Sequence, residues 1–301
     1  MANPIITSLP AYVEQNKSEL IAKSLLTGKT VEYLNLMTGV NSPTTLNDIV
    51  TEVTFADGSN CGFDATDTTT LTQRVLTPAV LKVNTTFCDK KLLNTYLTHE
   101  VKVGAGRETL PFEEKFTGGI VDGVKEGIEK MVWQGDSTQG NQCDGFIKIL
   151  AAAGAGTITV SEASGTTATK TITDTYMAMP ANIVDKEDAV VFVSESMYRK
   201  YIQELVAANM YHHDATYGNQ VYPIPGTSVR VIAVNGLNEA DHEYAVAGRL
   251  SNFYYGVDMA NDAEEFDLWY SKDDQIWKLA INFAAGVQVA YPNEVVLTTV
   301  A

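Results

Sequence analysis

Residues 111–136 read PFEEKFTGGIVDGVKEGIEKMVWQGD, and this stretch decides the fold. Apolar side chains recur in it at four-residue spacing, at Phe112, Phe116, Ile120, Val124 and Ile128. This spacing predicts one amphipathic helix that packs through a single apolar stripe. From Pro111 to Val132 the helix would be about 33 Å long, at roughly 1.5 Å per residue.

Four glycines, Gly118, Gly119, Gly123 and Gly127, lie inside this predicted helix. Each is less favourable than alanine in a helix by up to about 1 kcal/mol. Such a cost is easiest to explain if another element packs very closely against the glycine face. Lys125 with Glu129 and Glu126 with Lys130 are predicted to form exposed i,i+4 pairs.

The residues before the helix predict a second helix and then a long β-hairpin. Apolar side chains from Tyr12 to Leu25 are spaced as in a helix, which Gly28 would end. From Asp48 to Asn84 the chain is threonine-rich and alternates in polarity, as in strands. The tip of this hairpin is marked by a strong turn signal, Asp57-Gly58-Ser59-Asn60, followed closely by Phe63.

The hairpin would extend about 30–35 Å at roughly 3.3 Å per residue. Two interpretations remain open, an ordinary surface hairpin and an arm that gains its stability by lying on a neighbouring subunit. A strand is predicted from Leu71 to Val83 with an interruption at Pro78.

The second half predicts mixed strands and helices, so the class is α+β without an internal repeat. Residues 154–173 are rich in Gly, Ser, Thr and Ala, which favours a flexible hairpin or a passage between domains. A buried strand follows at Ala189–Val193, and a helix capped by Ser194 or Ser196 comes next. Several strands close the chain, two of them joined by a turn at Lys272-Asp273-Asp274.

The charge balance excludes direct DNA readout. The chain has 21 Lys and Arg residues against 37 Asp and Glu residues, a formal net charge of −16. Nucleic-acid binders need a basic face that displaces counterions from phosphate. Three cysteines without metal-site spacing, and the lack of a signal sequence or a membrane-spanning run, predict a reduced, cytosolic setting.

No pattern in the chain predicts catalysis, and we expect no catalytic residue, no metal ligand and no cofactor. His212 and His213 are adjacent, which is poor chelating geometry on a strand. The pairs Asp273-Asp274 and Glu264-Glu265 are more readily explained as solvated carboxylates than as a cation site. Gly104-Ala105-Gly106 lacks the third glycine of a dinucleotide fingerprint.

Several segments, taken in order, resemble the major capsid proteins of tailed bacteriophages, which have the Hong Kong 97 fold. Residues 111–136 look like the spine helix of that family and the turn that ends it. Val190–Ser194 with Met197–Tyr201 looks like the first strand and helix of the axial domain. Two C-terminal segments also match, namely 244–256 with its YAVAG and FYYG motifs, and the closing hairpin at 273–292.

The resemblance implies a domain map and a set of assembly residues. The map is an N-terminal arm (1–47), an extended loop (48–84), a peripheral domain (85–172) with spine helix 111–132, an axial domain (173–248) and C-terminal strands (249–301). The residues expected at contacts between subunits are the loop tip (Asp57, Gly58, Ser59, Asn60, Phe63), the spine stripe (Phe112, Phe116, Ile120, Val124, Ile128) and an axial loop (Tyr211, His212, His213, Tyr217).

The resemblance also implies partners and a location. The chain would self-assemble into the hexamers and pentamers of an icosahedral head, formed in the bacterial cytoplasm, that encloses double-stranded DNA without binding it specifically. A separate scaffolding protein, a portal and a decoration protein are the other expected partners. Some family members are cross-linked through a loop lysine, and the lack of lysine between Lys29 and Lys82 predicts no such bond here.

Two alternatives stay open. An encapsulin-like nanocompartment shares the fold but encloses enzymes instead of DNA, and small uniform shells formed without scaffold would favour it. A soluble acidic enzyme, with Asp273 and Asp274 as its candidate hydrolytic residues, would be a monomer with catalytic turnover.

Overall fold

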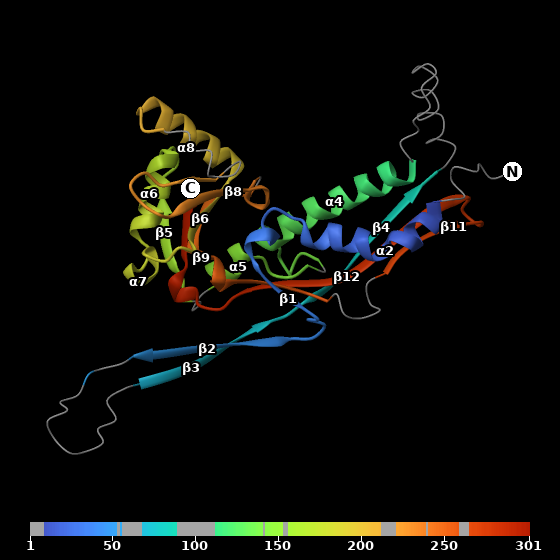
Figure 1. Cartoon of the computed structure of the whole chain (residues 1–301), viewed down its shortest axis with the longest axis horizontal. Coiled ribbons are helices and arrows are strands. Elements are labelled where there is room, and N and C mark those ends of the chain that lie inside the picture. Colours follow the sequence, from blue (N-terminus) through green and yellow to red (C-terminus); the bar gives the residue numbers. More distant parts are fainter. Residues whose placement is uncertain are drawn as a thin grey trace, which may run out of the picture.

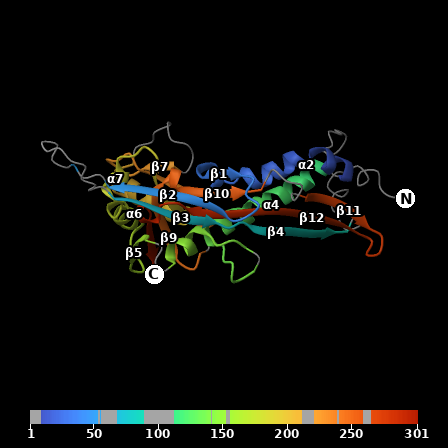
Figure 2. The same cartoon turned by 90° about the horizontal axis from the view of Figure 1, so that it is seen from below.

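The computed structural model describes residues 9–52, 55, 68–88, 112–140, 142–152, 156–211, 221–238, 240–258 and 265–301. An elongated sheet with two long helices lies beside a unit built on a six-stranded sheet, and a hairpin projects away from both (Figure 1). Seen from below, the two long helices lie along one side of the elongated sheet (Figure 2). The predicted α+β class is confirmed.

Both helices predicted for the first half are present. The helices are α2 (Leu9–Leu26), α4 (Phe112–Gln134), α5 (Phe146–Ala151), α6 (Ala168–Met177), α7 (Ala181–Val184) and α8 (Glu195–Ala207), with single 3-10 turns η1 (Val31–Tyr33), η2 (Asn235–Leu237), η3 (Leu250–Asn252) and η4 (Pro292–Glu294). α4 ends before Gly135, where a Cβ atom would lie 2.4 Å from the carbonyl oxygen of Cys143. Only glycine allows the returning chain to approach the helix end this closely.

The elongated sheet is organised around one central strand. Its strands are β1 (Asn35–Thr38), β10 (Phe253–Val257), β12 (Ile276–Val289), β11 (Glu265–Ser271) and β4 (Ala79–Phe87). β12 pairs with β11 and β10 along one edge and with β4 along the other. β12 is one continuous strand of 14 residues, long enough to pair with all three of these strands. The interruption predicted at Pro78 is confirmed, because β3 ends at Leu76 and β4 begins at Ala79. The second half of the predicted strand belongs to the elongated sheet and not to the hairpin.

The six-stranded sheet separates two hydrophobic cores. Its order is β5 (Ile158–Glu162), β13 (Val296–Val300), β9 (Glu243–Arg249), β6 (Ala189–Ser194), β8 (Arg230–Val234) and β7 (Val221–Pro223). Every residue of β6 is buried. Because side chains alternate along a strand, Val190 and Phe192 join the core next to α4, while Val191 and Val193 join the core under α6 and α8.

The passage expected at residues 154–173 is wrong over its described part, which begins at residue 156. Residues 158–162 form β5, which pairs in parallel with β13. α6 begins at Ala168, and the Thr167 side chain caps it by accepting from the Lys170 backbone N–H. Pairing with β13 and burial of Ile172 outweigh the weak helix and strand propensities of this composition. The domain boundary proposed at residue 173 falls inside α6.

Four aromatic rings join the two units. Trp133 at the end of α4 meets Phe146 of α5 and Phe192 of β6 edge to face, with ring centroids 5.3 and 5.2 Å apart. Phe253 of β10 packs on both phenylalanines at 5.2 and 5.7 Å. Edge-to-face pairs of buried rings stabilise a contact beyond the area that they bury. The junction therefore fixes the six-stranded unit to the end of the spine helix.

Candidate assembly surfaces

The hairpin is rooted in the elongated sheet and then leaves it. β2 (Thr44–Glu52) and β3 (Thr68–Leu76) pair antiparallel over their full length. At the root, Leu46 and Leu76 are buried, and Leu76 lies over Gly256 of β10, where a Cβ atom would come within 2.8 Å of its side chain. Figure 1 shows the hairpin extending beyond the rest of the molecule from this anchor.

One face of the hairpin exposes apolar side chains. Leu71 is 61% exposed and Val75 is 44% exposed, and their spacing of four residues puts both on the same face of β3. Phe55, just beyond β2, is 96% exposed. The predicted tip residues Asp57, Gly58, Ser59, Asn60 and Phe63 lie outside the described residues. The described part of the hairpin thus presents an apolar face that its own chain does not cover.

A groove of about 350 Å³ lies between α4 and β4. Its apolar lining comes from both elements and from β12, and consists of Leu81, Val83, Ile120, Val124, Ile128, Met131 and Phe283. Gly123 and Gly127 form part of its wall, and Lys82 and Gln142 contribute polar groups. We call this the spine groove.

The predicted spine stripe divides into three groups. Val124 and Ile128 are buried in the core, and Ile120 is half-buried in the spine groove. Phe112 and Phe116 lie in α4, but their side chains are outside what the structure describes. Among the described residues, no atom of another element lies within 4 Å of a Cβ added at Gly118, Gly119, Gly123 or Gly127. Nothing in the described chain makes the close approach that these glycines predicted.

The exposed pair predicted between Lys125 and Glu129 is wrong. Lys125 pairs with Asp122 at 3.6 Å, and Glu129 is only 6% exposed. The sequence pattern alone could not show this, because the group that buries and binds Glu129 lies 99 residues earlier, at Thr30.

A polar cluster of Thr30, Glu129 and Trp133 joins the end of the N-terminal segment to the spine helix. Thr30 donates its backbone N–H and its hydroxyl to the two carboxylate oxygens of Glu129, each at 2.5 Å. The indole N–H of Trp133 donates to the Thr30 hydroxyl at 3.0 Å. Burial raises the pKa of Glu129, and the hydrogen bonds from Thr30 oppose that rise. This cluster had no signal in the sequence.

The axial loop expected to contain Tyr211, His212, His213 and Tyr217 is described only at its first residue. Tyr211 stacks on Tyr222 of β7 with ring centroids 5.1 Å apart. Burial raises the pKa of the neighbouring Tyr198 to about 12, so this phenol stays neutral. His212, His213 and Tyr217 lie outside the described residues.

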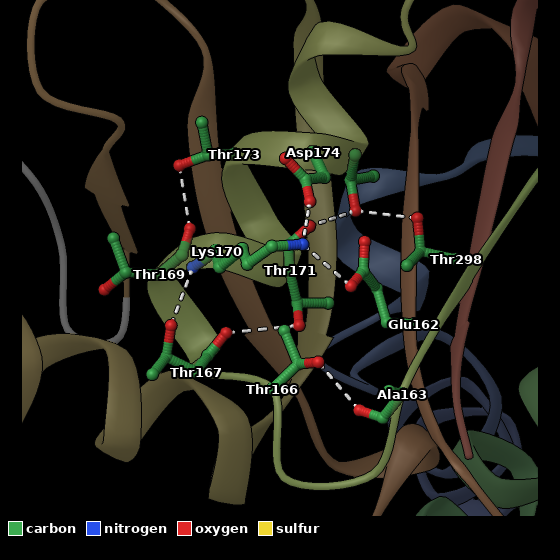
Figure 3. Close-up of polar contacts among 11 residues, drawn as sticks. Glu162, Ala163, Thr166, Thr167, Thr169, Lys170, Thr171, Thr173, Asp174 and Thr298 are labelled. Atoms are coloured by element: carbon green, nitrogen blue, oxygen red, sulfur yellow. Dashed lines mark hydrogen bonds and ion pairs between the residues drawn. The ribbon is translucent and has the colours of Figure 1, made fainter.

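Side chains of α6 bond to β13 and β5, the last two strands at one end of the six-stranded sheet (Figure 3). The Thr175 hydroxyl is 2.7 Å from that of Thr298 in β13, and both residues are buried. Lys170 forms ion pairs with Glu162 of β5 at 2.9 Å and with Asp174 of its own helix at 2.5 Å. These contacts stabilise the edge and leave no group of the cluster poised for chemistry.

The described residues contain no group of three His, Cys, Asp or Glu side chains arranged to hold a metal ion. Asp274, one of the carboxylates considered for hydrolysis, accepts from Lys278 and Ser271 in an exposed turn, and the Lys278 bond holds its pKa below the usual value. Burial raises the pKa of the Cys143 thiol to about 11, which keeps it protonated.

Among the described helices, none is long and apolar enough to cross a membrane.

No protein-family model matches the sequence, and no curated protein is similar to it in sequence. Solved structures do match. The procapsid of satellite phage P4 matches with a TM-score of 0.62 and 9% identity, over 100% of this chain and 98% of that one. The capsid of a native GTA particle matches with a TM-score of 0.60 and 12% identity, over 93% and 90%. A virus-like particle from Pyrococcus furiosus matches with a TM-score of 0.54 and 11% identity, over 95% and 99%. The chain has the Hong Kong 97 capsid fold, as the sequence resemblance implied.

Proposed function

We propose that this chain is the major capsid protein of a tailed phage, a structural protein that assembles with copies of itself into a closed shell. The observation that carries the proposal is the exposed apolar face of the hairpin, at Leu71 and Val75, in a subunit that also has an open apolar groove. In a monomer, both apolar surfaces would stay exposed to water, which is unfavourable. In a shell, the hairpin of one subunit and the groove of its neighbour would cover each other.

The hairpin of one subunit lies along the spine groove of a neighbour in this proposal. β3 has nine residues, about 30 Å at roughly 3.3 Å each, and α4 has 23 residues, about 35 Å at roughly 1.5 Å each. The two elements therefore match in length. Gly123 and Gly127 would let the strand approach the helix axis closely, which accounts for glycines that face open space within the subunit.

The shell would consist of hexamers and pentamers around double-stranded DNA. The six-stranded unit, with Tyr211 and the residues up to Tyr217, would meet its copies at the symmetry axes. The net charge of −16 is consistent with a shell that encloses DNA without binding it tightly, because like charges repel. Scaffolding, portal and decoration proteins would be separate partners. No described residue is placed for catalysis, so the proposed role is structural.

Purification of the chain followed by negative-stain electron microscopy tests the proposal. Closed icosahedral particles, formed alone or with a co-expressed scaffolding protein, are the expected result. A stable monomer under both conditions would overturn the proposal, and a monomer with catalytic turnover would establish the enzyme alternative.

Leu71→Asp tests the role of the hairpin. A charge on this face should abolish closed shells, because the contacts of the hairpin would require burial of an unpaired carboxylate. The isolated subunit should keep its stability within about 0.5 kcal/mol, since position 71 is exposed in the subunit. Gln73→Asp places a charge on the same face, between the two apolar residues, and should weaken assembly for the same reason. Normal particles from Leu71→Asp would show that the hairpin is not an interface.

A nanocompartment shell is the second candidate function, and the match to the virus-like particle from Pyrococcus furiosus favours it. Particle size and contents distinguish the two. Small uniform shells that form without scaffold and enclose protein would support the compartment, whereas larger heads that contain DNA would support the phage capsid.

A further inference from the structure

Arg74 is a half-buried cation at the root of the hairpin. It lies on the same face of β3 as the buried Leu76 and opposite Leu46 of β2, so its side chain is held against the elongated sheet. Its Nε atom is buried and has no hydrogen-bond partner among the described residues. Within the described part of the chain, its polar contact is from Nη2 to the side-chain oxygen of Gln288, at 3.5 Å.

Gln288 cannot satisfy this guanidinium. Its side-chain nitrogen donates to the carbonyl oxygen of Val75 at 2.7 Å, which fixes the orientation of the amide. Its oxygen already accepts from the Val289 N–H at 3.0 Å, and a contact of 3.5 Å adds little. Burial lowers the pKa of Arg74, and no ion pair with a described carboxylate opposes the effect.

A guanidinium carries five N–H donors in a planar fork that matches a carboxylate. Leaving such a charge half-buried without an acceptor costs free energy unless another molecule completes the site. Arg74 lies opposite Leu46 and contacts Gln288, and the described residues of the subunit provide no anion for it. This is the arrangement of a site prepared for an external partner.

We propose that Arg74 is a receptor for a carboxylate of a second copy of this chain, bound when the hairpin takes its place in the shell. This proposal rests on the proposed function, and it adds a charged contact between the subunits of the shell. Two observations favour a second copy over nucleic acid. The chain carries 37 acidic residues, so its own surface is the nearest abundant source of carboxylates. Arg74 also lies on β3, the strand that carries the exposed Leu71 and Val75 on its opposite face, so a neighbour that contacts the hairpin comes close to Arg74.

The test compares shell assembly by wild type, Arg74→Gln and Arg74→Lys. The readouts are the subunit concentration at which shells form, measured by light scattering, and the unfolding of the unassembled subunit, measured by circular dichroism. We expect Arg74→Gln to raise the concentration needed for assembly at least tenfold, without a loss of subunit stability. Arg74→Lys keeps the charge but loses the fork and should fall between the two.

Arg199→Gln is the matched control, because it removes one arginine charge from an exposed i,i+4 pair with Glu195. If Arg74→Gln assembles as the wild type and this control do, the inference is wrong while the proposed function stands. If the wild type forms no assembly under any condition, both fail together.

Two further outcomes would also overturn the inference. Asp48 lies diagonally across the hairpin from Arg74, paired with Thr72. If Asp48→Asn and Arg74→Gln destabilise the isolated subunit equally and leave assembly unchanged, the acceptor lies in the same chain. If Arg74→Gln changes only the nucleic-acid content of shells that otherwise form normally, the partner is phosphate.

Discussion

The six-stranded unit and the hairpin differ in how completely the chain covers them. Every residue of β6 is buried, with one core on each side of its sheet. On the hairpin, by contrast, Leu71 and Val75 face outward, and no described residue of the subunit covers them. The difference indicates which parts fold by themselves and which are completed by assembly. Substitutions in the first class should change the free energy of unfolding of the subunit, and those in the second should change assembly.

Phe192→Ala should produce the largest loss of subunit stability. Phe192 is fully buried and contacts Trp133 and Phe253, so its removal leaves a cavity where the two units join. We expect the free energy of unfolding to fall by about 3–5 kcal/mol. Urea denaturation of the unassembled subunit measures the change. Phe192→Leu should lose less, and equal losses from the two variants would argue against the cavity.

Gly236→Ala should come next, because the backbone of η2 lies directly on the spine helix. An added Cβ would be 2.1 Å from the Glu129 carbonyl oxygen and 2.3 Å from the Trp133 ring. The clash should cost about 1–3 kcal/mol of subunit stability. Thermal unfolding followed by circular dichroism gives the readout. An unchanged midpoint would mean that η2 is not held against α4 in solution.

Gly123→Ala should act in the opposite direction on the subunit. No described atom of another element lies within 4 Å of the added methyl group, so alanine should stabilise α4 by up to about 1 kcal/mol. Assembly should nevertheless weaken, because the methyl group would obstruct the approach of a neighbouring strand. Shells that form at the wild-type concentration from a more stable subunit would remove the glycine argument for the interface.

The smallest effect is a pH dependence from Glu129. Its native pKa is raised above the ordinary value of 4.5, so the folded state binds the proton more tightly than the unfolded state does. Stability from this group is therefore fully present below pH 4.5 and is lost as the pH rises through the native pKa. Relative to Glu129→Gln, the wild-type subunit should gain stability as the pH falls from 7 toward 4. A gain in the opposite direction would mean that the Thr30 hydrogen bonds outweigh burial.

Local sequence patterns predicted the elements that are specified by residues close together in the chain. Four-residue spacing placed α4, a continuous apolar run placed β6, and Lys272-Asp273-Asp274 placed the turn between β11 and β12. These predictions succeed because periodicity and turn chemistry depend only on neighbours along the chain. The hairpin was also predicted, although its tip lies outside the described residues.

Long-range contacts decided the rest. Residues 154–173 have the composition of a linker, and β5 and α6 form because β13, more than 100 residues later, offers a pairing edge and a buried threonine contact. Glu129 has the pattern of an exposed helical charge, and Thr30 makes it a buried one. The strand after Pro78 was predicted to belong to the hairpin, and pairing with β12 assigns it to the elongated sheet instead.

The sequence by itself therefore determined the spine helix, the buried strand, the hairpin and the acidic charge of this protein, because each depends on composition or on spacing within a few residues. Only the tertiary structure decided which charges are buried, which glycines face open space and that Arg74 lacks a described carboxylate partner. Those properties depend on contacts between residues that are far apart in the sequence, and local sequence patterns do not predict such contacts.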